Sequence, residues 1–164
     1  GFSYVAGAKG PVRVPQVGGL VAGARVEVGA NTCVDRGALD DTTLADDVKL
    51  DDLVLVGHNS QLGRGVLVAG QVGLGGSTRI EDGAVLGGQA GTADHATVGA
   101  GARVAAGAGV VRNVPPGATW AGRPGGLAGP MRRTWAALRH LPELVREVQD
   151  LAKRVSALES ERTP

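Results

Sequence analysis

From residue 20 to residue 110, one position in every six is aliphatic or small, and the spacing is read without a break. A second small or β-branched residue stands four residues after most of these positions. An amphipathic helix would space its apolar residues by about 3.6, and a half-buried strand by 2, so neither element accounts for the period. The positions of the six-residue period are Leu20, Val26, Thr32, Ala38, Leu44, Leu50, Val56, Leu62, Val68, Leu74, Ile80, Leu86, Thr92, Val98, Val104 and Val110.

A period of six fits a triangular prism. Each group of six residues forms one short flat wall, three groups close a coil, and successive coils stack at the strand spacing of about 4.8 Å. The residue at every sixth position points inward, and the small residue four positions later fills the corner. The spacing therefore predicts an all-β solenoid, a parallel β-helix of about five coils over residues 20–110.

The segments on either side interrupt the period. Residues 1–19 contain two prolines and several glycines and are expected to form an irregular loop leading into the solenoid. Phe2 and Tyr4 within it either cap the open end of the prism or line a site. Residues 111–129 include Pro115 and Pro116 and are expected to form an exit loop.

Residues 130–164 are rich in helix formers and predict a C-terminal α-helical extension. Pro142 lies inside this stretch, which predicts either two helices or one kinked helix. An apolar seam with alternating steps of three and four predicts a short coiled coil that packs on the prism or on copies of itself. The seam consists of Leu141, Leu144, Val148, Leu151, Val155 and Leu158.

Composition narrows the functional classes. The net charge of +1 argues against binding to nucleic acid, because no basic stripe dominates. Cys33 is the only cysteine, which excludes an internal disulfide and favours a reducing compartment such as the cytoplasm. The sequence contains no run of eighteen apolar residues, so no membrane span is predicted. The chain opens on Gly1 without a methionine, so it is interpreted as a fragment or a trimmed chain.

Two of the three histidines are candidates for chemistry. His58 and His95 are predicted to point outward from the same face, two coils or about 10 Å apart. Imidazole is the usual general base near neutral pH, and it works better when a carboxylate holds its other nitrogen. Asp51 or Asp52, one face earlier in the coil, could reach His58 across the corner. The alternative is that both histidines are ordinary surface residues, as is expected for His140.

A zinc site is the first alternative to a general-base role for these histidines. The γ-class carbonic anhydrases, which share the six-residue repeat, bind zinc with three histidines at subunit interfaces. His58 and His95 could supply two, but residues 96–111 contain no third histidine. Two ligands do not hold a catalytic zinc ion, so no metal and no other cofactor is predicted.

Several motifs in one order carry a resemblance to a known family. The chain closely resembles UDP-3-O-acylglucosamine N-acyltransferase, a hexapeptide-repeat enzyme that adds the second acyl chain in lipid A biosynthesis. The resemblance implies that the solenoid is a left-handed parallel β-helix. The motifs are GFSY at 1–4, VRVPQVG at 12–18, ANTCVDRGALDDT at 30–42, KLDDLVLVGHNSQLG at 49–63, GGQAG at 87–91 and PGATWAGRP at 116–124.

The resemblance implies transfer of a 3-hydroxyacyl chain from acyl carrier protein to the 2-amino group of a UDP-amino sugar. His58 matches the family's general base, Asp51 the carboxylate that supports it, and His95 a second histidine that lines the acyl-donor site and aids the oxyanion. Asn59, the second residue of the HN motif, is placed with the substrate-binding residues.

The same resemblance extends to the acyl chain and to the assembly. Gly109 matches a position that limits acyl-chain length, and a glycine there implies a longer or less restricted pocket. Arg112 matches a basic residue that helps to dock the acidic carrier protein. The family's sites lie between neighbouring prisms of a homotrimer, which gives the helical seam a role in assembly.

The chain departs from the family in three ways. It lacks the N-terminal uridine-binding domain and the first coils, it has Ser3 where glycine is more common, and it has Gly57 where alanine is more common. We therefore expect a C-terminal catalytic fragment with weakened nucleotide-sugar binding. Two alternatives stay open, namely a coenzyme A-dependent acetyltransferase of the same fold and an inactive trimeric scaffold.

Overall fold

The computed structural model describes residues 1–122 and 128–161, and within the C-terminal helix it describes the side chains of residues 133–156. The chain forms two units, Gly1–Arg123 and Pro124–Pro164. The first unit contains the solenoid and the second contains the helix.

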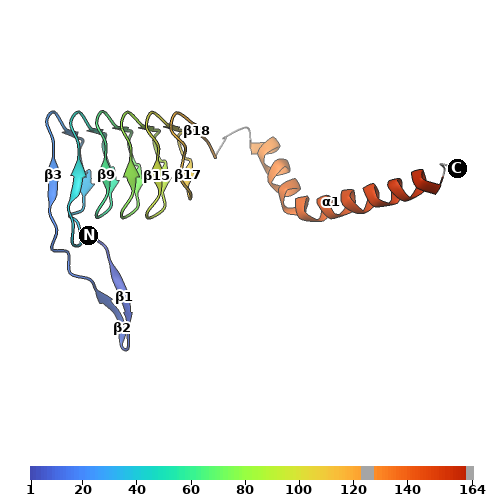
Figure 1. Cartoon of the computed structure of the whole chain (residues 1–164), viewed down its shortest axis with the longest axis horizontal. Coiled ribbons are helices and arrows are strands. Elements are labelled where there is room, and N and C mark those ends of the chain that lie inside the picture. Colours follow the sequence, from blue (N-terminus) through green and yellow to red (C-terminus); the bar gives the residue numbers. More distant parts are fainter. Residues whose placement is uncertain (123–127, 162–164) are drawn as a thin grey trace. The chain divides into compact units, whose positions relative to one another are not determined.

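Three parallel sheets form the walls of the solenoid (Figure 1). We call these sheets I, II and III. The chain passes through sheets III, I and II in that order, and one passage through all three makes a coil. Sheet I contains β4 (Glu27–Val28), β7 (Lys49–Leu50), β10 (Leu67–Val68), β13 (Val85–Leu86), β16 (Arg103–Val104) and β18 (Thr119–Trp120). Sheet II contains β5 (Cys33–Val34), β8 (Leu55–Val56), β11 (Gly73–Leu74), β14 (Gly91–Thr92) and β17 (Gly109–Val110). Sheet III contains β3 (Leu20–Ala22), β6 (Thr42–Leu44), β9 (Gln61–Leu62), β12 (Arg79–Ile80) and β15 (Thr97–Val98).

The core follows the predicted period from Leu44 to Val110. In most strands of this region the second residue is buried and the first faces outward. Small residues fill the corners, which is why a core without large aromatic side chains packs closely. The buried wall residues are Leu44, Leu50, Val56, Leu62, Val68, Leu74, Ile80, Leu86, Val98, Val104 and Val110, and the buried corner residues include Val48, Val54, Val66, Val72, Ala84, Ala90, Ala96, Ala102 and Ala108.

In the first coil the predicted register is wrong. Ala22, Val28 and Val34 pair with Leu44, Leu50 and Val56, so they occupy the wall positions that the period assigns to Leu20, Val26 and Thr32. The first coil is longer than the others: residues in register are 22 apart here and 18 apart in the middle of the solenoid. A slip of four residues exchanges corner positions for wall positions. Since both are apolar or small, the sequence pattern hides the slip.

The extra four residues form a bulge at residues 37–40, between β5 and β6. The first coil is tied to the second by Arg25, whose guanidinium donates two hydrogen bonds of 2.6 and 2.7 Å to the Asp47 carboxylate. The hydrogen bond from Arg25 holds the pKa of Asp47 below its usual value. The Arg25 and Asp47 side chains are 64% and 38% exposed, so this pair is expected to add little to stability.

At the other end, the solenoid continues past residue 110. Thr97 and Asn113 are 16 residues apart in register, Val98 bridges to Val114, and Trp120 pairs with Val104. The loop expected at residues 111–129 therefore carries the last walls, and sheet I has six strands where about five coils were predicted. The sequence pattern does not reveal these last walls because this coil is two residues shorter, which moves its wall positions off the six-residue spacing. Residues 123–127 of the expected loop lie outside the described residues.

The first nineteen residues are more regular than expected. An antiparallel hairpin forms from β1 (Tyr4–Gly7) and β2 (Gly10–Arg13), and Figure 1 shows it extending away from the coils. Phe2 and Tyr4 meet edge to face, with ring centroids 5.1 Å apart. Phe2 is 83% exposed. This exposure argues against the alternative in which the two rings cap the open end of the prism.

The C-terminal extension is one helix, α1 (Ala128–Glu161), with Pro142 inside it. Of the two alternatives for this segment, the single helix is the one observed, and Figure 1 shows that it bends. The described residues of the apolar seam are about half exposed, for example Leu151 at 54%. No helix in the described part of the chain is long and apolar enough to cross a membrane.

Candidate functional site

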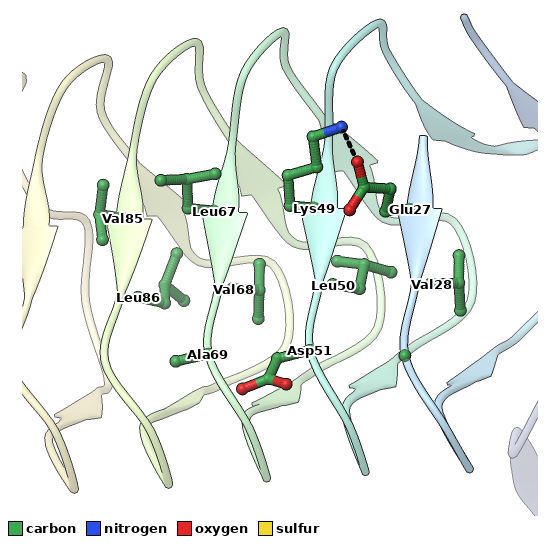
Figure 2. A pocket seen from close by; sticks show the side chains of 11 residues that line it. Glu27, Val28, Lys49, Leu50, Asp51, Leu67, Val68, Ala69, Val85 and Leu86 are labelled. Carbon is green, nitrogen blue, oxygen red and sulfur yellow. Dashed lines mark hydrogen bonds and ion pairs between the residues drawn. The ribbon is translucent and has the colours of Figure 1, made fainter. Parts of the chain in front are cut away.

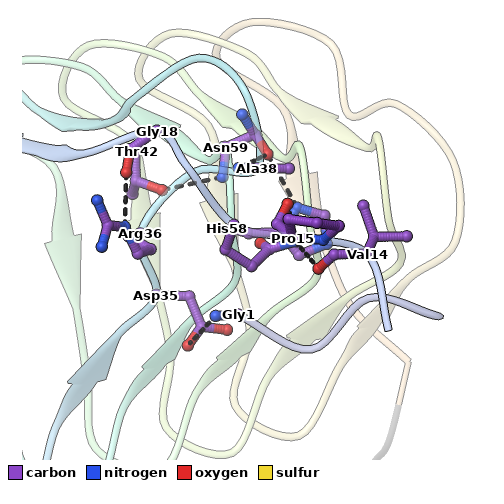
Figure 3. Close-up of polar contacts among 11 residues, drawn as sticks. Gly1, Val14, Pro15, Gly18, Asp35, Arg36, Ala38, Thr42, His58 and Asn59 are labelled. Carbon is purple, nitrogen blue, oxygen red and sulfur yellow. Dashed lines mark hydrogen bonds and ion pairs between the residues drawn. The ribbon is translucent and has the colours of Figure 1, made fainter. Parts of the chain in front are cut away.

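His58 lies at the corner where the chain passes from sheet II to sheet III, between β8 and β9. Its side chain is half-buried. Figure 3 shows Asn59 on one side of the imidazole and Asp35 and Gly1 on the other. The first residue of the chain approaches closely, since a side-chain carbon on Gly1 would lie 3.0 Å from the Cβ atom of His58.

Asn59 connects this corner to the 37–40 bulge. Its side-chain oxygen accepts a hydrogen bond of 2.9 Å from the backbone N–H of Ala38, and its side-chain nitrogen donates one of 2.9 Å to the carbonyl of Asp40. Its backbone N–H donates to the hydroxyl of Thr42 at 2.9 Å. The same side-chain oxygen is 3.0 Å from Nδ1 of His58. Asn59, predicted as a substrate-binding residue, thus joins the bulge and the imidazole.

The imidazole lies over the backbone of the next coil. Gly76 stands 18 residues after His58, and a side-chain carbon there would come within 2.7 Å of Nε2. A glycine at this position therefore gives the ring its space. The amide of Gly76 donates in turn to the carboxylate of Asp94 at 2.9 Å, one coil further on.

Asp51 lies at a different corner, between sheets I and II, next to Ala69 (Figure 2). Its Oδ1 accepts a hydrogen bond of 2.8 Å from the backbone N–H of Asp52. The Asp52 carboxylate accepts one of 2.6 Å from the backbone N–H of Ala30. Within one chain, the structure does not bring either carboxylate together with His58.

His95 lies at the same corner as His58, two coils further along. The two histidines differ by one position in register, because His95 aligns with Asn59 and Ser77 and adopts their left-handed conformation, with φ near 60°. Asp94 is the residue that aligns with His58. Both histidines thus occupy a turn along one edge of the prism, where the sequence predicts positions on a face. The side chain of His95 is exposed.

Gly109 and Arg112 meet at the last coil through Trp120, which sequence reasoning missed. The indole N–H of Trp120 donates a hydrogen bond of 3.0 Å to the carbonyl of Gly109. The Arg112 guanidinium carbon lies 5.4 Å from the centroid of the indole ring, a cation–π distance. The only sequence signal for Trp120 is its place in the PGATWAGRP motif.

The outward residues give each wall a different character. Sheet III carries Gln61, Arg79 and Thr97. Sheet I carries the apolar Leu67 and Val85, flanked by the charged Lys49 and Arg103. Along sheet II, the outward positions after Leu55 are three successive glycines, at residues 73, 91 and 109. We call these three residues the glycine track. It runs beside the corner that holds His58 and His95.

Three hollows lie on the walls and corners of the prism, and one of them, of about 470 Å³, is lined by Gln61 and Arg79 of sheet III. A groove of about 720 Å³ on sheet I is lined by Leu67, Val85 and Asp51, among others, and does not include His58 (Figure 2). A cleft of about 360 Å³ is lined by Asn59, the 37–40 bulge and sheet III. Among the described residues, no group of three or more His, Cys, Asp or Glu side chains is arranged to hold a metal ion.

Comparison with known proteins matches part of the chain to acyltransferases. No protein-family profile matches it. A segment of 78 residues, 48% of the chain, is 49% identical to UDP-3-O-acylglucosamine N-acyltransferase 2 of Legionella pneumophila (strain Lens). That segment covers 23% of the relative, so the chain spans less than a quarter of the length of the curated relatives it matches.

Solved structures agree on the fold. The UDP-N-acetylglucosamine acyltransferase of Francisella novicida aligns with a TM-score of 0.60 at 24% identity, covering 70% of this chain and 45% of its own. The acetyltransferase domain of PglB from Neisseria gonorrhoeae aligns with a TM-score of 0.51 at 27% identity, covering 64% and 52%. The solenoid is therefore a left-handed parallel β-helix, and over the matched segment the chain is similar to the UDP-3-O-acylglucosamine N-acyltransferases.

Proposed function

We propose that the chain is the catalytic part of an N-acyltransferase that moves a 3-hydroxyacyl chain from acyl carrier protein to the 2-amino group of a UDP-3-O-acylglucosamine. The observation that carries the proposal is the half-buried His58 corner on a solenoid whose matched segment is 49% identical to such an enzyme. Because the chain spans only part of its relatives, the substrates are inferred from that likeness.

In this proposal Nε2 of His58 is the general base. It takes a proton from the amine as the nitrogen attacks the thioester carbonyl, so that a C–N bond forms and the C–S bond breaks. The thiolate then leaves and receives the proton. His95, further along the same edge, is proposed to stabilise the oxyanion. General-base catalysis of this kind is worth about 10²–10⁴-fold in rate.

The glycine track is proposed to hold the acyl chain. A side-chain carbon added at Gly73 or Gly109 would meet no other atom within 4 Å, so both positions open onto free space. The bare sheet beside His58 therefore leaves room for an extended hydrocarbon chain. Arg112, held against Trp120 at the end of the track, is proposed to bind the acidic carrier protein.

A homotrimer would account for the placement of Asp51. The corner that carries Asp51 faces away from the corner that carries His58 in one chain, so Asp51 can support His58 only from a neighbouring copy. The apolar outward residues of sheet I, together with the exposed seam of α1, offer the surfaces for such an assembly.

We expect light scattering on the 164-residue chain to give the mass of a trimer. A chain ending at residue 122 should dissociate already at a higher protein concentration, because it lacks the apolar seam of α1. A chain that stays monomeric at every concentration tested would contradict a site between neighbouring prisms.

The runner-up is a coenzyme A-dependent acetyltransferase. It is favoured by the likeness to the acetyltransferase domain of PglB and by the exit segment PPGATWAGRP. The two functions differ in the donor, because only the first needs a long hydroxyacyl chain and a protein carrier.

A donor comparison separates these two functions. The chain is incubated with a UDP-amino sugar and either 3-hydroxyacyl carrier protein or acetyl-coenzyme A, and release of free thiol is followed. We expect thiol release from the 3-hydroxyacyl carrier protein to be at least about tenfold faster than from acetyl-coenzyme A. A tenfold difference corresponds to about 1.4 kcal/mol of additional transition-state binding of the larger donor. The reverse preference would support the acetyltransferase.

A further inference from the structure

We infer that Asn59 is a positioning residue that fixes the tautomer of His58, with hydrogen on Nδ1 and the lone pair on Nε2, and that the 37–40 bulge holds Asn59 for this task. The inference rests on the proposed function only for the use made of His58. The arrangement itself follows from the hydrogen bonds around Asn59.

The first step is the orientation of the Asn59 amide. Its nitrogen end faces the carbonyl of Asp40 at 2.9 Å, and its oxygen end faces the backbone N–H of Ala38 at 2.9 Å. A flipped amide would set oxygen against a carbonyl and NH₂ against an N–H, which loses both hydrogen bonds. The bulge thus decides which end of the amide faces His58.

The second step is the imidazole. The amide oxygen of Asn59 has no hydrogen and can only accept, so Nδ1 of His58, 3.0 Å away, must be the donor. In a neutral imidazole only one nitrogen carries hydrogen, so Nε2 is left with the lone pair. Nε2 is also the nitrogen that lies over Gly76. The general base is therefore prepared in the tautomer that the reaction needs.

The third step is the rigidity of the brace. Asn59 adopts a left-handed conformation, with φ of 59°, which asparagine tolerates better than most residues. Its backbone N–H donates to the hydroxyl of the fully buried Thr42. Within one chain the partner of Nδ1 is this uncharged amide, and Asp51 of a neighbouring copy is the carboxylate that the proposed trimer would add. The charged groups of the surrounding elements include Asp35, paired with the Gly1 amino group at 3.7 Å, and Asp94 beyond Gly76. Arg36, whose guanidinium donates to the carbonyl of Gly18, and Asp40 lie on the segment that forms the bulge.

The test is the nitrogen NMR spectrum of the histidine rings in the ¹⁵N-labelled, unliganded full chain. We expect the neutral form of His58 to carry its hydrogen on Nδ1. Asn59→Gly, which keeps the left-handed backbone and removes the amide, should shift His58 toward the Nε2–H tautomer. Ser77→Gly is the matched control at the same turn position one coil on, and it should leave the tautomer unchanged.

Kinetics add a readout that a purely structural role would not move. Asn59→Gly should lower kcat by about 10–100-fold with little change in KM, the range found when a group that orients a functional histidine is removed. Hydrogen on Nε2 in the wild-type chain would overturn the inference even if Asn59→Gly failed to fold. The expected tautomer in a chain without acyl transfer would instead uphold the inference and reject the proposed function.

Discussion

Replacing His58 by alanine is expected to lower kcat for acyl transfer by about 10²–10⁴-fold, the usual contribution of a general base. The substitution removes the imidazole from a half-buried turn whose backbone φ is not left-handed, so the fold should persist. KM should change little, because the base acts on the amine in the transition state. Steady-state thiol release gives kcat and KM, and circular dichroism of the same sample checks that the fold persists.

His140→Ala is the control for this experiment. His140 is an exposed residue of α1 and is given no role in the reaction, so its replacement should leave kcat within about twofold, the scatter expected for a surface change. A folded His58→Ala chain that keeps the wild-type rate would show that His58 is not the base.

Replacing Gly37 by alanine is expected to give the largest loss of stability, about 3 kcal/mol or more in the free energy of unfolding. An added methyl group would overlap the carbonyl oxygen of Asp40, and it would lie 3.0 Å from the side-chain nitrogen of Asn59. The 37–40 bulge would have to open, which would also release Asn59 from its two backbone partners. Urea unfolding followed by circular dichroism measures the loss.

Gly73→Ala is the matched control, because a methyl group there meets no atom within 4 Å. Its free energy of unfolding should change by less than about 0.5 kcal/mol, as is usual for a surface substitution. Equal effects at residues 37 and 73 would mean that the bulge can accept a methyl group at residue 37 without opening.

The walls of the prism could be predicted because they depend on a local rule. From Leu44 to Val110 each inward residue is fixed by its distance from the one before it, and the spacing of six is visible in the sequence. The ends could not be predicted in the same way. The longer first coil keeps an apolar pattern after a slip of four, and the shorter last coil places Val114 and Trp120 off the period.

The candidate site was located from the sequence only in part. Periodicity and resemblance placed His58 and His95 on one side of the prism, two coils apart. The partner of the imidazole could not be derived, because Asn59 is oriented by the bulge, and the bulge becomes visible only once strands 22 residues apart are paired. Asp51 was expected beside His58 from its distance along the coil, but the two residues lie at different corners, and the wall formed by β8 separates them in one chain.

Mass spectrometry of the product tests the central claim most directly. The full chain is incubated with 3-hydroxyacyl carrier protein and a UDP-glucosamine acylated at the 3-position, and the sugar product is isolated. We predict a mass gain equal to the hydroxy acid less one water, with the new chain in an amide on the 2-nitrogen. His58→Ala should form this product about 10²–10⁴-fold more slowly. An unchanged sugar with the folded wild-type chain, or an ester in place of the amide, would contradict the account.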